Sequence, residues 1–321
     1  MKTLIFKLFC WAIVVSLFGC GFAVREAVPR EQSDATEVYF CPRENCSSVF
    51  ESNIMSAKSS VSCALYDLNL ENLISSFYIK SKTIDVNLVM DEASKDTGLK
   101  GNVKFDDSSQ LMHNKFCVID NSIVMTGSFN PTFNDNNLNN NNLVVLHSKI
   151  LSANYNNEFD ELWKGKFGEG SRVQSPVMYL NDAKIENYFC PEDNCADKVV
   201  DLIKNAKKSV YFMTFSFTSE KIADALISRD GIEIKGVFDK GQASNKFSQD
   251  ERLKGFGIDA TLDKSKYKLH HKVFIIDNET VVTGSFNPTL SGDTRNDENI
   301  LIIHDKEIAK EFLEEFENMF S

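Results

Sequence analysis

Residues 268–277 read KLHHKVFIID, and residues 111–120 read LMHNKFCVID. Each stretch is followed by the same seven letters, TGSFNPT, at 283–289 and at 126–132. Matching positions in the two copies are 157 residues apart throughout. A repeat with constant internal spacing indicates that one structural unit is present twice in the chain.

Each copy has the pattern of a β-hairpin. In the second copy, residues 272–276 form an apolar, largely β-branched run that is typical of a buried strand. A turn at 277–279 then leads into a second strand at 280–284. Residues two apart on a strand share a face, so we expect His270 and Lys272 to project together.

One hairpin collects four kinds of polar group. The first copy offers the imidazole of His113 and the ammonium of Lys115, and the hairpin returns Ser128 and Asn130 to them. The second copy offers the corresponding groups of His270, Lys272, Ser285 and Asn287. Two facing copies suit a phosphoryl group, because lysines and amides hold its oxygens while one imidazole attacks and the other donates a proton. The alternative is a duplicated structural hairpin with its histidines satisfied in the core.

The pattern H-x-K-x-x-x-x-D followed by G-S-x-N, present twice, resembles the phospholipase D superfamily. The resemblance covers nearly all of the chain after its first 20 residues. It implies an α/β fold of two tandem, pseudo-twofold-related α/β sandwich halves that share one active site. Strands and helices alternate in both halves, as such a fold requires.

The resemblance also implies site residues. It makes His113, Lys115, His270 and Lys272 catalytic, and it assigns phosphate binding to Asn130, Asn287, Ser128 and Ser285. The reaction needs no metal or other cofactor, and the sequence has no carboxylate cluster that would hold a metal. Asp120 and Asp277 belong to the motif but lie at strand ends, so we interpret them as structural. His271 should face away from His270 and pack in the core, and His147 and His304 are interpreted as structural.

The two halves differ at one chemically important position. Glu298 lies 28 residues after His270, whereas Asn141 lies 28 residues after His113. In the resembling family a glutamate at this place accepts a hydrogen bond from the histidine and fixes its tautomer. We therefore expect Glu298 to favour protonated His270 as the general acid and His113 to act as the neutral nucleophile. A weakened enzyme is the alternative.

The chain divides into five segments. They are a signal peptide at 1–20, a tether at 21–37, a first half at 38–168, a linker at 169–185 and a second half at 186–321. The leader carries two lysines around an apolar run. It ends in LFGC at 17–20, which resembles a lipoprotein box with Cys20 as the lipidated residue. Plain secretion and an uncleaved membrane anchor are alternatives, and all three place the protein outside the cytoplasm.

The remaining cysteines agree with export. Two C-P-x-x-N-C elements are present, and we expect local disulfides Cys41–Cys46 and Cys190–Cys195 in an oxidising compartment. A zinc site made of these four thiolates is the alternative, although its spacing is wider than usual. Cys63 and Cys117 lie in apolar strand patterns and are expected to be buried free thiols.

Charge and size bear on the substrate. The net charge of −11 argues against a large basic surface for nucleic acid. We therefore expect hydrolysis of phospholipid head-group phosphodiesters through a phosphohistidine, at a membrane surface reached by a lipid anchor. The compact halves favour an exported endonuclease for DNA or RNA as the alternative. Phosphatidyl transfer, as in cardiolipin synthesis, and a catalytically dead binding module are further alternatives. A monomer is sufficient for one active site.

Overall fold

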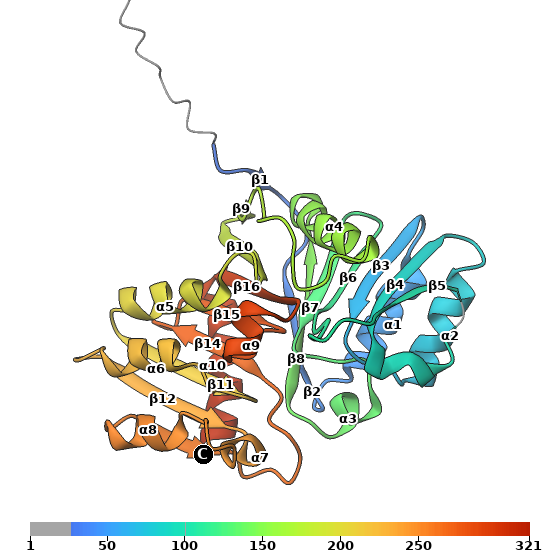
Figure 1. Cartoon of the computed structure of the whole chain (residues 1–321). Helices are drawn as coiled ribbons and strands as arrows, with labels where there is room; N and C mark the ends of the chain where they lie inside the picture. Colours follow the sequence, from blue (N-terminus) through green and yellow to red (C-terminus); the bar gives the residue numbers. More distant parts are fainter. Residues whose placement is uncertain (1–26, 100) are drawn as a thin grey trace, which may run out of the picture.

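The computed structural model describes residues 27–99 and 101–321, and the internal repeat of the sequence appears in it as two α/β halves (Figure 1). The expected signal peptide, lipidated Cys20 and the first part of the tether lie outside the described residues. Within the described part of the chain, no helix is both long and apolar enough to cross a membrane.

The first half contains one seven-stranded sheet. Its elements are β2 (Glu37–Cys41), α1 (Cys46–Ser56), β3 (Ser60–Leu65), α2 (Glu71–Lys80), β4 (Asp85–Asp91), the 3-10 helix η1 (Glu92–Thr97), β5 (Asn102–Asp106), β6 (Lys115–Ile119), β7 (Ile123–Gly127), α3 (Phe133–Asn137), β8 (Asn141–His147) and α4 (Lys149–Trp163). The strand order is β2-β8-β7-β6-β3-β4-β5.

The second half contains a nine-stranded sheet and repeats this plan. Its elements are β9 (Val177–Leu180), β10 (Ala183–Cys190), α5 (Cys195–Asn205), β11 (Ser209–Thr214), α6 (Glu220–Ile227), β12 (Glu233–Phe238), α7 (Lys240–Ala243), α8 (Asp250–Gly255), β13 (Asp259–Leu262), β14 (Lys272–Ile276), β15 (Thr280–Gly284), α9 (Leu290–Thr294), β16 (Glu298–His304) and α10 (Lys306–Phe320). The order β10-β16-β15-β14-β11-β12-β13 matches the first sheet strand for strand. The predicted pair of related α/β halves is therefore confirmed.

Two additional strands extend the second sheet. β9 and the start of β10 fall in the segment expected to be a linker, and β1 (Arg30–Glu31) falls in the expected tether. β1 pairs with β9 in parallel, and β9 pairs with β10. Met178 and Leu180 are buried, so β9 has the alternating burial of a sheet strand. This short alternation was hidden by the neighbouring Gly, Ser and Pro residues.

The helices lie in layers around the two sheets. Core clusters place α1 and α2 on the outer face of the first sheet, and α5 and α6 on the outer face of the second. A third cluster, to which α4 and α10 contribute, spans both halves. In it Tyr155 of α4 packs on Phe189 of β10, and Phe312 of α10 packs on Phe40 of β2, each at 5.0 Å between ring centroids. These crossed aromatic contacts bury the interface between the halves.

Buried amides also join the halves. Asn142 and Asn299 are repeat-equivalent and fully buried. Asn299 donates to the side chain of Asn114 at 2.9 Å, and Asn142 donates to Nδ1 of His271 at 3.0 Å. His271 is itself fully buried and lies 3.3 Å from Glu315 on α10. This position agrees with the packing role expected for His271.

The hairpin turns carry the aspartates of the motif. Asp120 accepts hydrogen bonds from the backbone N–H groups of Lys58, Ser59 and Ser60, and Asp277 does the same for residues 207–209. Asp120 and Asp277 both have positive φ, at 51° and 56°. They fasten the turn to the start of the neighbouring strand, which agrees with a structural role.

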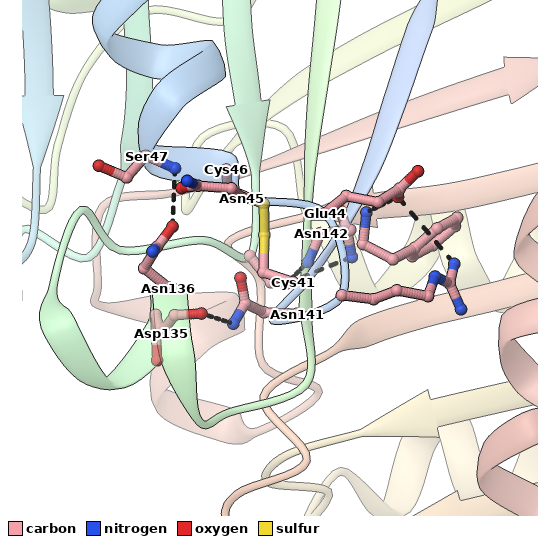
Figure 2. The surroundings of a disulfide bond; sticks show 12 residues. Cys41, Glu44, Asn45, Cys46, Ser47, Asp135, Asn136, Asn141 and Asn142 are labelled. Atoms are coloured by element: carbon pink, nitrogen blue, oxygen red, sulfur yellow. Dashed lines mark hydrogen bonds and ion pairs between the residues drawn. A yellow bond between two sulfur atoms is a disulfide. The ribbon is translucent and has the colours of Figure 1, made fainter.

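The structure contains three disulfides within the described residues. The expected bonds Cys41–Cys46, drawn in Figure 2, and Cys190–Cys195 are present. The expectation that Cys63 and Cys117 are free thiols is wrong, because they form a third disulfide. They lie directly opposite each other on β3 and β6, a pairing that joins residues 54 apart in sequence. The disulfides also exclude the zinc alternative for the four local cysteines.

Candidate active site

The backbone of each histidine is held by the opposite half. The N–H of His113 donates to the carbonyl of Asp297 at 3.0 Å, and the N–H of His270 donates to the carbonyl of Asn140 at 2.7 Å. Asn140 and Asp297 occupy equivalent positions just before β8 and β16. His113 therefore lies beside the start of β16, and His270 lies beside the start of β8.

Both histidines line one cavity of about 400 Å³ between the halves. Asn130 and Asn287 line it as well, as expected for phosphate-binding amides. The other lining residues include Tyr66, Asp67, Leu111, Thr132, Asp135, Asn139, Phe215, Lys268 and Thr289. The side-chain oxygens of Asn130 and Asn287 accept no hydrogen bond within the described chain, so they can accept one from a hydroxyl or a protonated group of a ligand.

The two motif lysines lie beneath this lining. Lys115 donates to the carbonyl of His113 at 2.7 Å, and Lys272 donates to the carbonyl of His270 at 2.8 Å. Both side chains are almost fully buried. Burial lowers the pKa of Lys115 to about 8 and that of Lys272 well below its usual value. An anion in the cavity would oppose this effect and favour charged lysines.

Glu298 supports a different histidine from the one we expected. Its Oε2 lies 2.8 Å from Nδ1 of His113 in a buried hydrogen bond, so the predicted pairing with His270 is wrong. The cross-half backbone bonds explain the difference, because they place the start of β16 next to His113. Spacing within one half could not show that the start of β16 lies beside the histidine of the first half and the start of β8 beside that of the second.

His270 has its own carboxylate, which the sequence reasoning missed. Oδ2 of Asp135, on α3, lies 3.3 Å from Nδ1 of His270. This contact is longer than the one between Glu298 and His113, and Nδ1 of His270 has no hydrogen-bond partner among the described residues. A usable signal was present, since Asp135 takes the place of Gly292 in the second copy. Asn141, at the position equivalent to Glu298, donates to the carbonyls of Asp135 and Asn139, at 2.8 Å each.

The electrostatics of the cavity walls keep both imidazoles neutral. Burial lowers the pKa of His113 to about 4, although Glu298 opposes the shift. Burial and the ammonium of Lys272 lower the pKa of His270 to about 3, against the opposing effect of Asp135. The expectation that a carboxylate raises the pKa of His270 is thus outweighed by desolvation. A phosphodiester anion would shift both groups back toward the imidazolium.

Ser128 and Ser285 lie outside the cavity lining. Each is fully buried, and its hydroxyl accepts a hydrogen bond from the backbone N–H of Asn142 (3.0 Å) or Asn299 (2.9 Å). These serines therefore hold the starts of β8 and β16 in place. Direct contact between their hydroxyls and a phosphoryl group stays a prediction.

The paired HxK motifs, the shared cavity and the fold define a phosphoric diester hydrolase of the phospholipase D type. The family model described as "Cardiolipin synthase, PLD-like domain" matches residues 50–163 and 199–320, and the chain belongs to this family.

Named relatives agree with this class. A phospholipase D of Rickettsia conorii is 34% identical over 144 residues, which cover 44% of this chain and 72% of the relative. The mitochondrial cardiolipin hydrolase of Xenopus tropicalis is 29% identical over 150 residues, covering 45% of this chain and 70% of the relative. The phosphatidylserine synthase of Haemophilus influenzae shares the fold, with a TM-score of 0.67 at 13% identity over 88% of this chain and 85% of that chain.

Proposed function

We propose that this protein hydrolyses phospholipid head-group phosphodiesters at a membrane surface, without a metal and through a phosphohistidine intermediate. The observation that carries the proposal is one cavity lined by two histidines, each beside a carboxylate, with an exposed apolar residue directly after a cavity-lining threonine in each half. The relatives named phospholipase D and cardiolipin hydrolase support a lipid substrate.

The first displacement forms the intermediate. Nε2 of His113 attacks phosphorus as the bond to the leaving oxygen breaks, and His270 gives that oxygen a proton. In the second displacement His270 takes a proton from water, and the resulting hydroxide attacks phosphorus and releases His113. Lys115, Lys272 and the amides of the two cavity asparagines stabilise charge on the phosphoryl oxygens.

The roles of the histidines follow from their carboxylates. Attack by Nε2 places positive charge on the ring of His113, and Glu298 at 2.8 Å from Nδ1 stabilises that charge. His270, whose carboxylate lies at 3.3 Å, exchanges its proton with the leaving group and water. His113 therefore remains our proposed nucleophile. We expected this role because His113 would lack a carboxylate, and we now propose it because Glu298 supplies one.

Two exposed apolar side chains next to cavity-lining residues favour a membrane surface as the place where the protein acts. Phe133 and Leu290 occupy repeat-equivalent positions, directly after the cavity-lining Thr132 and Thr289. Their exposed fractions are 59% and 70%, which is high for large apolar side chains. Apolar groups on both sides of a polar cavity suit insertion among lipid acyl chains while the head group enters the cavity. A site for nucleic acid would instead favour basic residues at these positions.

The proposed location is outside the cytoplasm. Three disulfides favour an oxidising compartment. Lipid anchoring through Cys20 would add a second attachment to the membrane beside the apolar mouth, and it stays a prediction.

The decisive experiment offers the purified protein phospholipid vesicles and single-stranded DNA or RNA in parallel, all in EDTA. His113→Ala and His270→Ala are the matched inactive controls. We expect head-group release that both variants lose. Strand cleavage lost in both variants would replace the lipid substrate with a nucleic acid, and transfer of the phosphatidyl group to an added alcohol in place of water would identify a transferase.

A further inference from the structure

The carboxylate next to each histidine comes from a different structural position in the two halves. In the second half it is Glu298, the first residue of β16, whereas the equivalent residue of β8 is Asn141. In the first half it is Asp135 on α3, whereas the equivalent residue of α9 is Gly292. The pair Asp135 and Asn141 in one half thus corresponds to the pair Gly292 and Glu298 in the other.

The backbones at the exchanged positions correspond. The N–H of Asp135 donates to Thr132 Oγ1 at 3.2 Å, and the N–H of Gly292 donates to Thr289 Oγ1 at 3.0 Å. A Cβ atom built on Gly292 would lie 2.5 Å from the carbonyl oxygen of Asn287, so an aspartate does not fit there without a backbone shift. The second half therefore needs its carboxylate on the strand, and only the first half has room for it on the helix.

Asn141 helps to hold the carboxylate of the first half at its different position, on Asp135. Its amide donates to the backbone carbonyl of Asp135 at 2.8 Å, and Figure 2 shows this link beside the first disulfide. The Asp135 carboxylate is further held by the backbone N–H and side chain of Asn130, both at 2.9 Å, and by Asn139 at 2.7 Å. Asn141, which has an amide where Glu298 has a carboxylate, thus fixes the backbone of Asp135, which has a carboxylate where Gly292 has no side chain.

We propose that Asp135 is the positioning residue of His270 and that it replaces the carboxylate missing at position 141. The assignment rests on the proposed phosphodiesterase chemistry. Asp135 holds the imidazole through Nδ1, leaves Nε2 to face the phosphoryl group, and orients the phosphate-binding amide of Asn130 through the same oxygen. Burial acts to raise the pKa of Asp135, but His270 and the amides around it hold the pKa below its usual range, so the carboxylate is ionised.

A purely structural role for Asp135 makes a different prediction. The cap of α3 is the hydroxyl of Thr132, so the carboxylate is not required for the cap. Among the described residues, the charges that act most strongly on His270 are those of Lys272, Asp135 and Lys115, and of these three Asp135 is the anion. If the carboxylate served only to hold the loop, its removal could lower kcat but would not change which ring nitrogen of His270 carries the proton.

The test uses the full chain purified in detergent and the soluble diester bis(p-nitrophenyl) phosphate. Asp135→Asn is expected to lower kcat by about tenfold to hundredfold, the range for carboxylates that fix the orientation and tautomer of a histidine. Asp135→Gly should lower it at least as much. The double variant Asp135→Gly/Asn141→Glu copies the second half and should recover at least tenfold over Asp135→Gly. Asp293→Asn, which copies Asn136 onto α9, is the matched control and should leave kcat unchanged.

A second readout does not depend on turnover. The ¹⁵N shifts of the histidine rings report which nitrogen of His270 carries the proton, with His270→Ala for assignment. The Nδ1–H tautomer should lose population in Asp135→Gly and return in the double variant, while His113 stays unchanged. Unaltered kcat in Asp135→Asn together with an unaltered His270 tautomer in Asp135→Gly would overturn the assignment. If the tautomer shifts as expected but the wild type cleaves no phosphodiester, the proposed function fails and the positioning role stands.

Discussion

His113 and His270 are equivalent by sequence but differ in how a carboxylate holds them. Glu298 makes a buried hydrogen bond to His113 at 2.8 Å, whereas Asp135 approaches His270 at 3.3 Å and shares its charge with two amides. A short charge-assisted hydrogen bond stabilises a ring that becomes cationic more than a longer ion pair does. The two rings therefore suit different steps of one reaction.

This difference predicts where the covalent intermediate forms. We expect phosphorus to be trapped on His113 when the protein is quenched in acid-free conditions during turnover of a labelled diester. His270→Ala should accumulate the adduct, because the water-activating group is lost, and His113→Ala should form none. Peptide mass spectrometry locates the label, and a phosphorylated His270 in the wild type would reverse the assignment.

Glu158 is a second residue whose environment has a measurable effect. Burial, with Asp297 and other nearby acids, raises the pKa of Glu158 well above its usual value. A raised folded-state pKa stabilises the fold below the unfolded pKa, near 4, and this stability is lost as pH rises through the folded value. Glu158→Gln should therefore raise Tm at pH 8 by about 2–4 °C, a change of about 1 kcal/mol, and have little effect at pH 4.5.

Glu315 provides the matched control, because it is the repeat equivalent of Glu158. Burial acts to raise its pKa, but His271 and Arg43 hold the pKa below its usual value. Glu315→Gln should consequently lower Tm at pH 8. Thermal melts of both variants at the two pH values check the opposite signs, and a lower Tm for Glu158→Gln at pH 8 would contradict the prediction.

At the scale of elements, the short helix α3 depends on the disulfide loop beside it. Asn136 of α3 accepts the backbone N–H of Ser47, the second residue of α1, next to the Cys41–Cys46 bond (Figure 2). In the second half Asp293 of α9 accepts the N–H of Ala196, next to Cys190–Cys195. The two arrangements match, but only α3 carries a carboxylate for a histidine.

Removal of the two local disulfides should therefore have unequal effects. Cys41→Ser/Cys46→Ser is expected to lower kcat severalfold, because it loosens α3 and with it Asp135. Cys190→Ser/Cys195→Ser should lower Tm to a similar extent with a smaller loss of kcat, since α9 has Gly292 at the equivalent position. Melting curves and rates on a soluble diester separate the two effects, and equal losses of kcat would show that α3 is held by other contacts.

Several elements could be read from the sequence and others could not. The β6–β7 and β14–β15 hairpins were predicted because their apolar runs, turns and glycines are strong local signals. β5 has no comparable local signal, because it is a short edge strand rich in polar residues. The Cys63–Cys117 bond was missed because strand neighbours 54 residues apart leave no local pattern.

At the scale of the molecule, the proposed function requires the exposed residues Phe133 and Leu290 to face the same side as the cavity. Phe133 and Leu290 come from different halves, and Figure 1 shows that α3 and α9 belong to the two sides of the interface. A membrane that contacts both side chains would present its head groups to the cavity between them. Burial of each large apolar side chain contributes roughly 1.5–3 kcal/mol.

Charged substitutions at the mouth should therefore separate lipid turnover from intrinsic activity. Phe133→Asp and Leu290→Asp are each expected to reduce hydrolysis of vesicle phospholipid by about tenfold, which corresponds to about 1.4 kcal/mol. Rates on a soluble diester should remain close to wild type. Phe256→Asp, at an equally exposed phenylalanine beyond α8, is the control and should change neither rate. Equal loss on both substrates would indicate a damaged cavity instead of a membrane contact.

The sequence predicted the number of halves and the four motif residues because these depend on repeat spacing. It could not predict which histidine Glu298 supports, since that depends on the backbone bonds of His113 and His270 to the opposite half. It also missed Asp135, because a Thr-x-x-Asp pattern at the start of a helix is common as a capping signal. Relations between the halves, unlike those within them, required the structure.

The cross-half pairing has a consequence for the life of the chain before it is complete. Glu298 follows His113 by 185 residues, so His113, the proposed nucleophile, lacks its carboxylate until nearly the whole chain has been synthesised. His270 likewise gains its carboxylate only when the second half packs against α3, which carries Asp135. Contacts between such distant residues form late in folding. A nascent, truncated or half-folded chain is therefore inactive, and the ability to hydrolyse phosphodiesters appears only when the fold is complete.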